Sequence, residues 1–119
     1  MPSLYKEHII DHYRNPRNFK TLSNFTHKAK LFNTSCGDEI VAFLRIEKEK
    51  VTNVGFKGSG CAISIAAMSI LSEKLIGLDI EEIGDKLLNQ LLEELNIAPD
   101  SPRIKCAMLG HEATAKAIK

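Results

Sequence analysis

The sequence predicts an α+β fold, in which a three-stranded antiparallel meander occupies the first half of the chain and helices accompany it. Segments at about residues 25–32, 39–47 and 51–57 have the residue types of strands, and polar turns separate them. A run of small and apolar residues from Cys61 to Leu71 is then long enough for a buried helix. Strands grouped together and followed by helices are typical of this class.

A first helix is expected before the strands, with Ser3 as its cap. It carries His8 and His12, whose spacing of four residues places both rings on one side, as in some zinc sites. The alternative is a pair of solvated histidines beside Glu7 and Asp11, and we favour it because no third ligand is evident nearby.

Further helices are expected in the second half of the chain. Asp79 can begin a short helical piece that Gly84 interrupts, and a leucine stripe over residues 87–95 predicts the next helix. Ser101 is the expected cap of the last helix. That helix is predicted to bury Ile104, Ala107, Met108, Ala115 and Ile118.

Length and composition exclude several classes of protein. A chain of 119 residues can bury a core without disulfides, so we expect a single domain over residues 1–119. Sixteen basic and fifteen acidic residues are mixed along the chain, which argues against nucleic acid as a partner. No apolar run is long enough to cross a membrane and no signal peptide is evident, so we expect a cytoplasmic protein. Three cysteines without close pairs leave metal binding, nucleophilic chemistry or burial.

Cys61 lies at the turn between the third strand and the buried helix. Gly58 and Gly60 flank Ser59 and allow a tight backbone there. Such a turn, followed by a helix start, aims backbone N–H groups at the thiol and favours its anionic form. The alternative is that Cys61 is a small buried hydrophobic residue.

Cys36 is expected near Cys61 because of the hairpin between the second and third strands. If the turn is centred between Lys48 and Glu49, the antiparallel pairing sets Cys36 opposite Cys61. Opposite residues have Cβ atoms about 4.5 to 5.5 Å apart, and two thiolates on one tetrahedral zinc lie about 3.8 Å apart. A shared metal ion is therefore within reach of both cysteines.

Asp38 and Cys106 are the further candidates for this centre. Gly37 permits a sharp turn that returns the Asp38 carboxylate toward the Cys36 thiolate, although Asp38 could instead accept local backbone hydrogen bonds. Cys106 lies in the first turns of the last helix, where unpaired N–H groups favour a thiolate. Three cysteines at chain-turning points, with Asp38 beside one of them, indicate a metal or sulfur-handling site.

Four segments give the chain a specific resemblance. They are Ile10-Asp11-His12-Tyr13 with Asn15-Pro16-Arg17-Asn18, Cys36-Gly37-Asp38, Gly58-Ser59-Gly60-Cys61-Ala62-Ile63-Ser64, and Arg103-Ile104-Lys105-Cys106-Ala107. In this order and at these separations, they resemble the U-type iron–sulfur cluster assembly scaffold family, which includes IscU-like and SufU-like proteins and the N-terminal part of NifU. The resemblance covers nearly the whole chain.

The resemblance implies a small α+β domain whose antiparallel sheet is covered on one side by about four to five helices. It implies a site of Cys36, Asp38, Cys61 and Cys106 that binds zinc or iron, or carries a transient [2Fe-2S] cluster. Sulfur would come from a cysteine desulfurase, and the cluster would go to recipient apo-proteins.

Two departures bear on the branch of the family. IscU-like members typically have histidine where this chain has Lys105. They also carry a Leu-Pro-Pro-Val-Lys segment that an Hsp70-type chaperone recognises, whereas this chain has Asp100-Ser101-Pro102-Arg103-Ile104-Lys105. A role for such a chaperone is therefore doubtful. SufU-like members usually have an extra segment between the second and third cysteines, and the short spacing from Cys61 to Cys106 leaves no room for it.

Three functions follow in order of preference. The first is a scaffold that assembles an iron–sulfur cluster and passes it on, with Asp38 as the ligand most easily displaced. The second is a zinc-dependent sulfurtransferase in which Cys36 accepts persulfide sulfur from the desulfurase. The third is a structural zinc domain, which is disfavoured because a chain of this length has enough core without a metal.

Overall fold

A computed structural model describes residues 2–34 and 37–119, with side chains from Glu7 onward. The helix α1 (Pro2–Arg14) precedes three strands, β1 (His27–Asn33), β2 (Asp38–Glu47) and β3 (Lys50–Ser59). The helix α2 (Ala62–Leu75), the short 3₁₀ helix η1 (Ile80–Glu82), α3 (Asp85–Leu95) and α4 (Ile104–Ala117) follow. Each of these helices is too short or too polar to cross a membrane.

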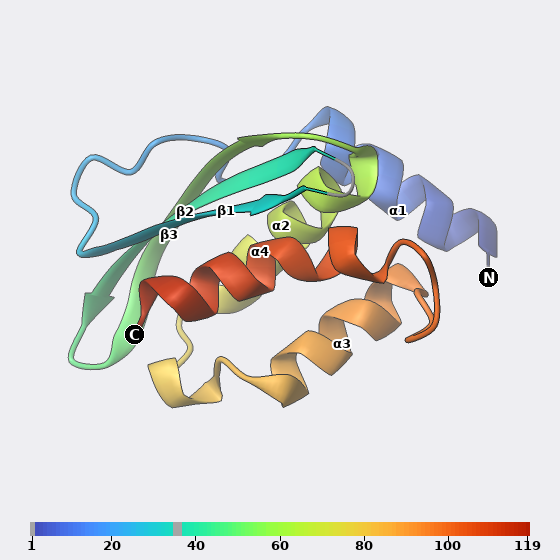
Figure 1. The fold of residues 1–119 in the computed structure, drawn as a ribbon. Helices are drawn as coiled ribbons and strands as arrows, with labels where there is room; N and C mark the ends of the chain where they lie inside the picture. The colour runs from blue at the N-terminus through green and yellow to red at the C-terminus, as the bar shows by residue number, and fades with distance from the viewer. Residues whose placement is uncertain (1, 35–36) are drawn as a thin grey trace.

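The strands form one antiparallel sheet in the order β1-β2-β3, as the sequence predicts (Figure 1). Helices α2 and α4 pack against one face of the sheet, and α3 packs outside them. Helix α1 lies mainly along α2. The expected α+β fold with helices on one side is confirmed.

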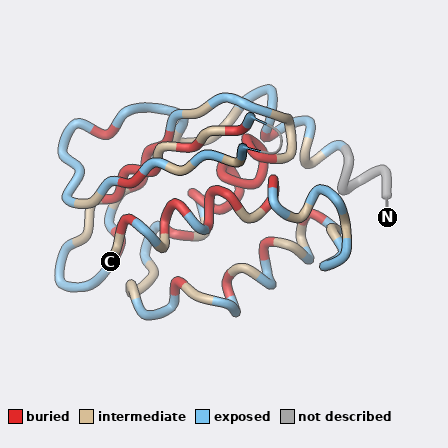
Figure 2. The backbone as a smooth tube through the Cα atoms, viewed as in Figure 1, coloured by how far each residue is buried: buried red, intermediate tan, exposed pale blue. Residues whose placement is uncertain are grey.

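The core lies between the sheet and the helices α2 and α4, where Figure 2 shows most of the buried residues. Alternate residues of β2, namely Ile40, Ala42 and Leu44, point into it, and so does Phe56 of β3. Helix α2 is buried along most of its length, which explains why its sequence shows no polar face.

A β-bulge in the hairpin corrects the predicted register. Glu47 pairs with Lys50 and Ile46 with Val51, as a turn at Lys48 and Glu49 requires, but Arg45 pairs with Asn53. Thr52 is therefore an extra residue, and every later pair is moved by one position. The pairing that sets Cys36 opposite Cys61 does not hold beyond this bulge, and Cys36 itself lies outside the described residues.

Two helix predictions also need correction. Helix α1 begins at Pro2, before Ser3, and α4 begins at Ile104, two residues later than a cap at Ser101 implies. Ser101 Oγ instead accepts a hydrogen bond from the N–H of Arg103, at 3.1 Å, within the preceding turn.

The predicted inner face of α4 is only partly right: Ala107 is fully buried and Ile118 packs half-buried against the core, but Ile104, Met108 and Ala115 are only half-buried. The buried residues of α4 are Cys106, Ala107, Leu109, Gly110, His111, Ala113, Thr114 and Ala117. Small residues face inward because α2 lies very close, and a Cβ atom added at Gly110 would overlap the Met68 side chain.

Candidate metal centre

Asp38, Cys61 and Cys106 converge at one end of the sheet. Asp38 is the first residue of β2, Cys61 immediately precedes α2 as its N-cap, and Cys106 lies in the first turn of α4. One carboxylate oxygen and the two sulfur atoms all lie within 4.8 Å of one another. Among the described residues, no other group of three such side chains is as close, and the fourth predicted ligand, Cys36, lies outside these residues.

The backbone around Gly60 makes this convergence possible. Gly60 has a φ of +143°, a conformation that favours glycine. A Cβ atom at this position would overlap the carboxylate of Asp38, so the glycine leaves the space that Asp38 occupies. At the other strand, Gly37 has a φ of +73°, which agrees with the predicted sharp turn before Asp38.

The Asp38 carboxylate is fully buried and held by hydrogen bonds. Its Oδ1 accepts from the backbone N–H of Cys61, with an N···O distance of 2.8 Å. Its Oδ2 accepts from the hydroxyl of Ser64 at 2.5 Å, and the Cys61 thiol lies 3.6 Å from the same oxygen. Asp38 thus accepts a backbone hydrogen bond from across the site, from the residue that precedes α2.

Ser64 is a site residue to which sequence reasoning gave no role. Its hydroxyl is buried and lies 3.6 Å from Cys61 Sγ and 3.3 Å from the carbonyl oxygen of Cys106. It therefore contacts all three converging residues. The available signal was its position three residues after Cys61, which places both residues on the same side of α2.

Access to this group is from the Cys61 side. Asp38 and Cys106 are buried, whereas Cys61 is partly exposed. Two soft sulfur donors and one harder oxygen donor suit zinc or iron. Sulfur ligands on one tetrahedral zinc lie about 3.8 Å apart, so this spacing requires only small adjustments.

The histidines of α1 do not belong to this group. His12 is buried, so the expectation of two solvated histidines is wrong for it, whereas His8 is partly exposed. Burial lowers the pKa of His12, and the positive charges of Arg17 and His8 act in the same direction. The carboxylates nearest these rings come from Glu94 and Glu73, although the charge of the predicted neighbour Asp11 also acts on the pKa of His12 and raises it.

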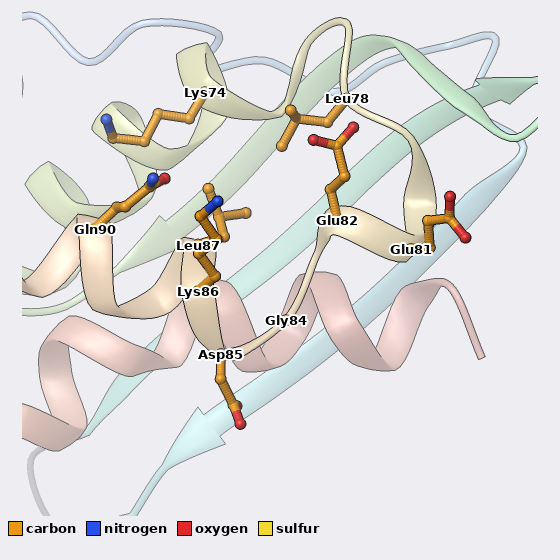
Figure 3. A pocket seen from close by; sticks show the side chains of 9 residues that line it. All are labelled: Lys74, Leu78, Glu81, Glu82, Gly84, Asp85, Lys86, Leu87 and Gln90. Atoms are coloured by element: carbon orange, nitrogen blue, oxygen red, sulfur yellow. The ribbon is translucent and has the colours of Figure 1, made fainter.

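A surface hollow of about 600 Å³ lies elsewhere, between the end of α2, η1 and the start of α3 (Figure 3). Lys74 and Glu82 lie on opposite sides of it, while Asp85 points away. None of the described residues that line the hollow is a cysteine or a histidine, so Asp38, Cys61 and Cys106 do not contribute to it.

The model of the NifU-like N-terminal domain family matches residues 4–119. The chain belongs to this family. Family membership confirms the resemblance to U-type iron–sulfur cluster assembly proteins that the sequence motifs indicate.

Relatives within this family have names from two branches. The zinc-dependent sulfurtransferase SufU of Bacillus subtilis is 32% identical over 135 residues, covering 99% of the chain and 91% of the relative. The iron–sulfur cluster assembly scaffold protein IscU of Aquifex aeolicus is 32% identical over 117 residues, covering 97% and 74% respectively. The SufU alignment is longer than this 119-residue chain, so that relative has residues which the chain lacks.

Solved structures show the same fold. A candidate iron–sulfur cluster assembly scaffold protein for the SUF system from Fervidobacterium islandicum AW-1 superposes with a TM-score of 0.83, 24% identity and 98% coverage of both chains. The N-terminal part of a NifU-like protein from Brucella abortus gives a TM-score of 0.78 at 20% identity, covering 96% of this chain and 91% of that one. At these identities the similarity establishes the fold alone.

Proposed function

We propose that this protein is a cytoplasmic scaffold for iron–sulfur cluster assembly. In this proposal Cys36, Asp38, Cys61 and Cys106 hold iron and a nascent [2Fe-2S] cluster as cargo. A cysteine desulfurase supplies the sulfur, and recipient apo-proteins take the cluster. The observation that carries the proposal is the convergence of Asp38, Cys61 and Cys106 within 4.8 Å.

The donor set suits cargo that must be released. Thiolates hold iron or zinc tightly, and a carboxylate among them is the weaker ligand for these metals. A closed structural zinc site normally has four firm ligands, whereas a transfer site needs one position that can exchange. Asp38 has the N–H of Cys61 and the hydroxyl of Ser64 as hydrogen-bond donors, and these can stabilise its charge when it leaves the metal.

The alternative function is a zinc-dependent sulfurtransferase, the name of the relative from Bacillus subtilis. Zinc held by the same residues would keep the thiols as thiolates. In this alternative the Cys36 thiolate attacks the outer sulfur of the desulfurase persulfide. The S–S bond breaks, Cys36 becomes the persulfide, and the desulfurase cysteine leaves as a thiolate. Lys105, in place of a histidine ligand, favours this alternative.

Anaerobic reconstitution with iron, cysteine, reductant and desulfurase distinguishes the two functions. A scaffold should release any zinc and accumulate a visible cluster chromophore. A sulfurtransferase should retain zinc, accelerate the desulfurase in proportion to its own concentration, and gain the mass of one sulfur atom. Retained zinc, no chromophore and a strongly accelerated desulfurase would overturn the scaffold proposal.

The ligand assignment has its own test. The metal of the cysteine site, measured after purification, should fall sharply in Cys61→Ser and remain in the double variant His8→Ala, His12→Ala. A Cys61→Ser protein that keeps its metal at full stoichiometry would contradict the assignment, whichever of the two functions is correct.

A further inference from the structure

A second cluster of metal-binding side chains lies on the helical side of the molecule. A hollow of about 280 Å³ is formed where α1, α2 and α3 meet. It is lined by His8, His12, Ile70, Glu73, Lys74 and Glu94. Two imidazoles from one helix therefore face carboxylates from two other helices.

Each imidazole already lies close to one carboxylate. His8 Nε2 is 3.5 Å from Glu94 Oε2, and His12 Nε2 is 3.7 Å from Glu73 Oε1. In a tetrahedral zinc site with bonds of about 2.0 to 2.1 Å, neighbouring nitrogen and oxygen ligands lie about 3.3 to 3.4 Å apart. Both pairs are thus close to the spacing of two ligands on one ion.

The two pairs lie side by side, because the rings of His8 and His12 pack edge to face with centroids 4.7 Å apart. Bringing all four atoms to one ion requires side-chain rotation. Three of these side chains have the freedom for it, since His8, Glu73 and Glu94 are 41%, 55% and 36% exposed.

His12 is the fixed member of the group. Its Nδ1 lies 2.7 Å from the hydroxyl oxygen of Ser69. The same oxygen accepts a hydrogen bond from the backbone N–H of Arg17, at 2.8 Å. With its proton on Nδ1, His12 donates to Ser69 and keeps the lone pair of Nε2 toward the hollow. Metal-bound histidines usually make such a hydrogen bond through their other ring nitrogen.

Lys74 is the competing cation. Its Nζ lies 3.0 Å from Oε1 of Glu94, so it partly neutralises that carboxylate. An ion bound in the hollow has to share Glu94 with this ammonium group or displace it. Removing the lysine charge should therefore strengthen metal binding.

We propose that His8, His12, Glu73 and Glu94 form a second metal site, separate from Asp38, Cys61 and Cys106, for a divalent ion of the zinc type. Imidazole and carboxylate ligands suit such ions. The bound ion links α1 to α2 and α3, and so fixes the N-terminal helix on the domain. The proposal does not depend on the function proposed for the cysteine site.

Calorimetric titration of the full chain with Zn²⁺ alone, after one equivalent has been loaded, tests this site. The parent should bind a second equivalent. His8→Ala and Glu94→Gln should each weaken that second step by about tenfold or more and leave the first unchanged. Cys61→Ser should do the reverse.

Matched substitutions make the result specific. His27→Ala on β1 and Glu93→Gln, beside Glu94 on α3, should leave the second step unchanged, whereas Lys74→Met should tighten it. Absence of a second step in the parent would overturn the proposal. So would a second step that is equally strong in the parent, His8→Ala and Glu94→Gln.

Discussion

The backbone N–H of Cys61 donates a hydrogen bond to Oδ1 of Asp38, over 2.8 Å. This contact joins the end of β3 to the start of β2 at the point where the chain turns into α2. It leaves Oδ2 as the carboxylate oxygen beside the Cys61 thiol and the Ser64 hydroxyl. The two oxygens of Asp38 therefore have different surroundings: Oδ1 holds the backbone at Cys61, and Oδ2 lies beside the side chains of Cys61 and Ser64.

Replacing Asp38 should slow the exchange of the bound metal or cluster without preventing its binding. In Asp38→Ala the three thiolates should still hold the centre, but cluster transfer to apo-ferredoxin should become slower because the exchangeable ligand is lost. Loss of the buried acceptor should also lower the unfolding free energy by about 1–3 kcal/mol, measured by urea denaturation. Transfer at the parental rate would contradict the role of Asp38 in exchange.

Gly60→Ala should reduce metal retention, because the new methyl group would overlap the Asp38 carboxylate. Gly77→Ala is the matched control, since Gly77 also has a positive φ, of +94°, but has no atom within 4 Å of the added Cβ. Both variants should lose stability through backbone strain, by about 1 kcal/mol or more. Only Gly60→Ala should retain less zinc than the parent, as measured by metal analysis of the purified protein. Equal zinc content in the two variants would be evidence against this steric argument.

Ser64→Ala should weaken metal binding without removing a ligand. The hydroxyl holds Oδ2 of Asp38, and loss of such a supporting hydrogen bond typically lowers metal affinity about 10- to 100-fold. Competition with a chromophoric chelator measures this change. Ser72→Ala is the control, since Ser72 is also buried on α2 but contacts Arg17, Asn18 and Ser69. Similar affinities in Ser64→Ala and the parent would show that Ser64 does not support the ligand.

His111 should make the fold less stable in mild acid. It is buried on α4, and its Nε2 lies 3.1 Å from the carbonyl oxygen of Gly84. Burial lowers its pKa below the ordinary 6.5, although the Gly84 hydrogen bond and the charges of Asp85 and Glu112 oppose this shift. As the pH falls through the ordinary value, the unfolded chain binds a proton that the folded chain does not, so stability decreases.

The variant His111→Gln tests this effect, because glutamine can donate to the Gly84 carbonyl but does not titrate. Urea denaturation between about pH 7.5 and pH 5.5 should show a smaller loss of stability in His111→Gln than in the parent. The comparison isolates His111 from His12, whose pKa is also lowered but which both proteins share. Parallel pH profiles would mean that His111 does not cause the acid sensitivity.

Much of the fold could be predicted because local patterns and tertiary structure agree. Alternating residues of β2 identify the inward face that Ile40, Ala42 and Leu44 form, and the polar segment at Lys48 and Glu49 is indeed the hairpin turn. The turn around Gly60 likewise leads into a buried helix. At the site, the prediction that Asp38 lies beside Cys61 and Cys106 agrees with the described geometry.

Other features depend on contacts that no local pattern encodes. The inner face of α4 is set by its closeness to α2, so small residues such as Gly110 are buried while Met108 is only half-buried. His12 is buried because α2 supplies Ser69 as its partner. Ser64 gains its role only when Asp38 and Cys106 arrive from distant parts of the chain.

The bulge at Thr52 has a consequence for insertions and deletions. Asp38 meets Gly60 and Cys61 only because the extra residue moves every later pair of the hairpin by one position. Side chains alternate between the two faces of a strand, so a change of one residue in the length of β3 beyond the bulge would turn the partner of Asp38 to the opposite face. A one-residue deletion between Asn53 and Ser59 would thus disable the site while every proposed ligand remained in the chain, whereas deletion of Thr52 itself would leave every later pair in place. Chain length in this hairpin is therefore expected to tolerate far less variation than residue identity at its exposed positions.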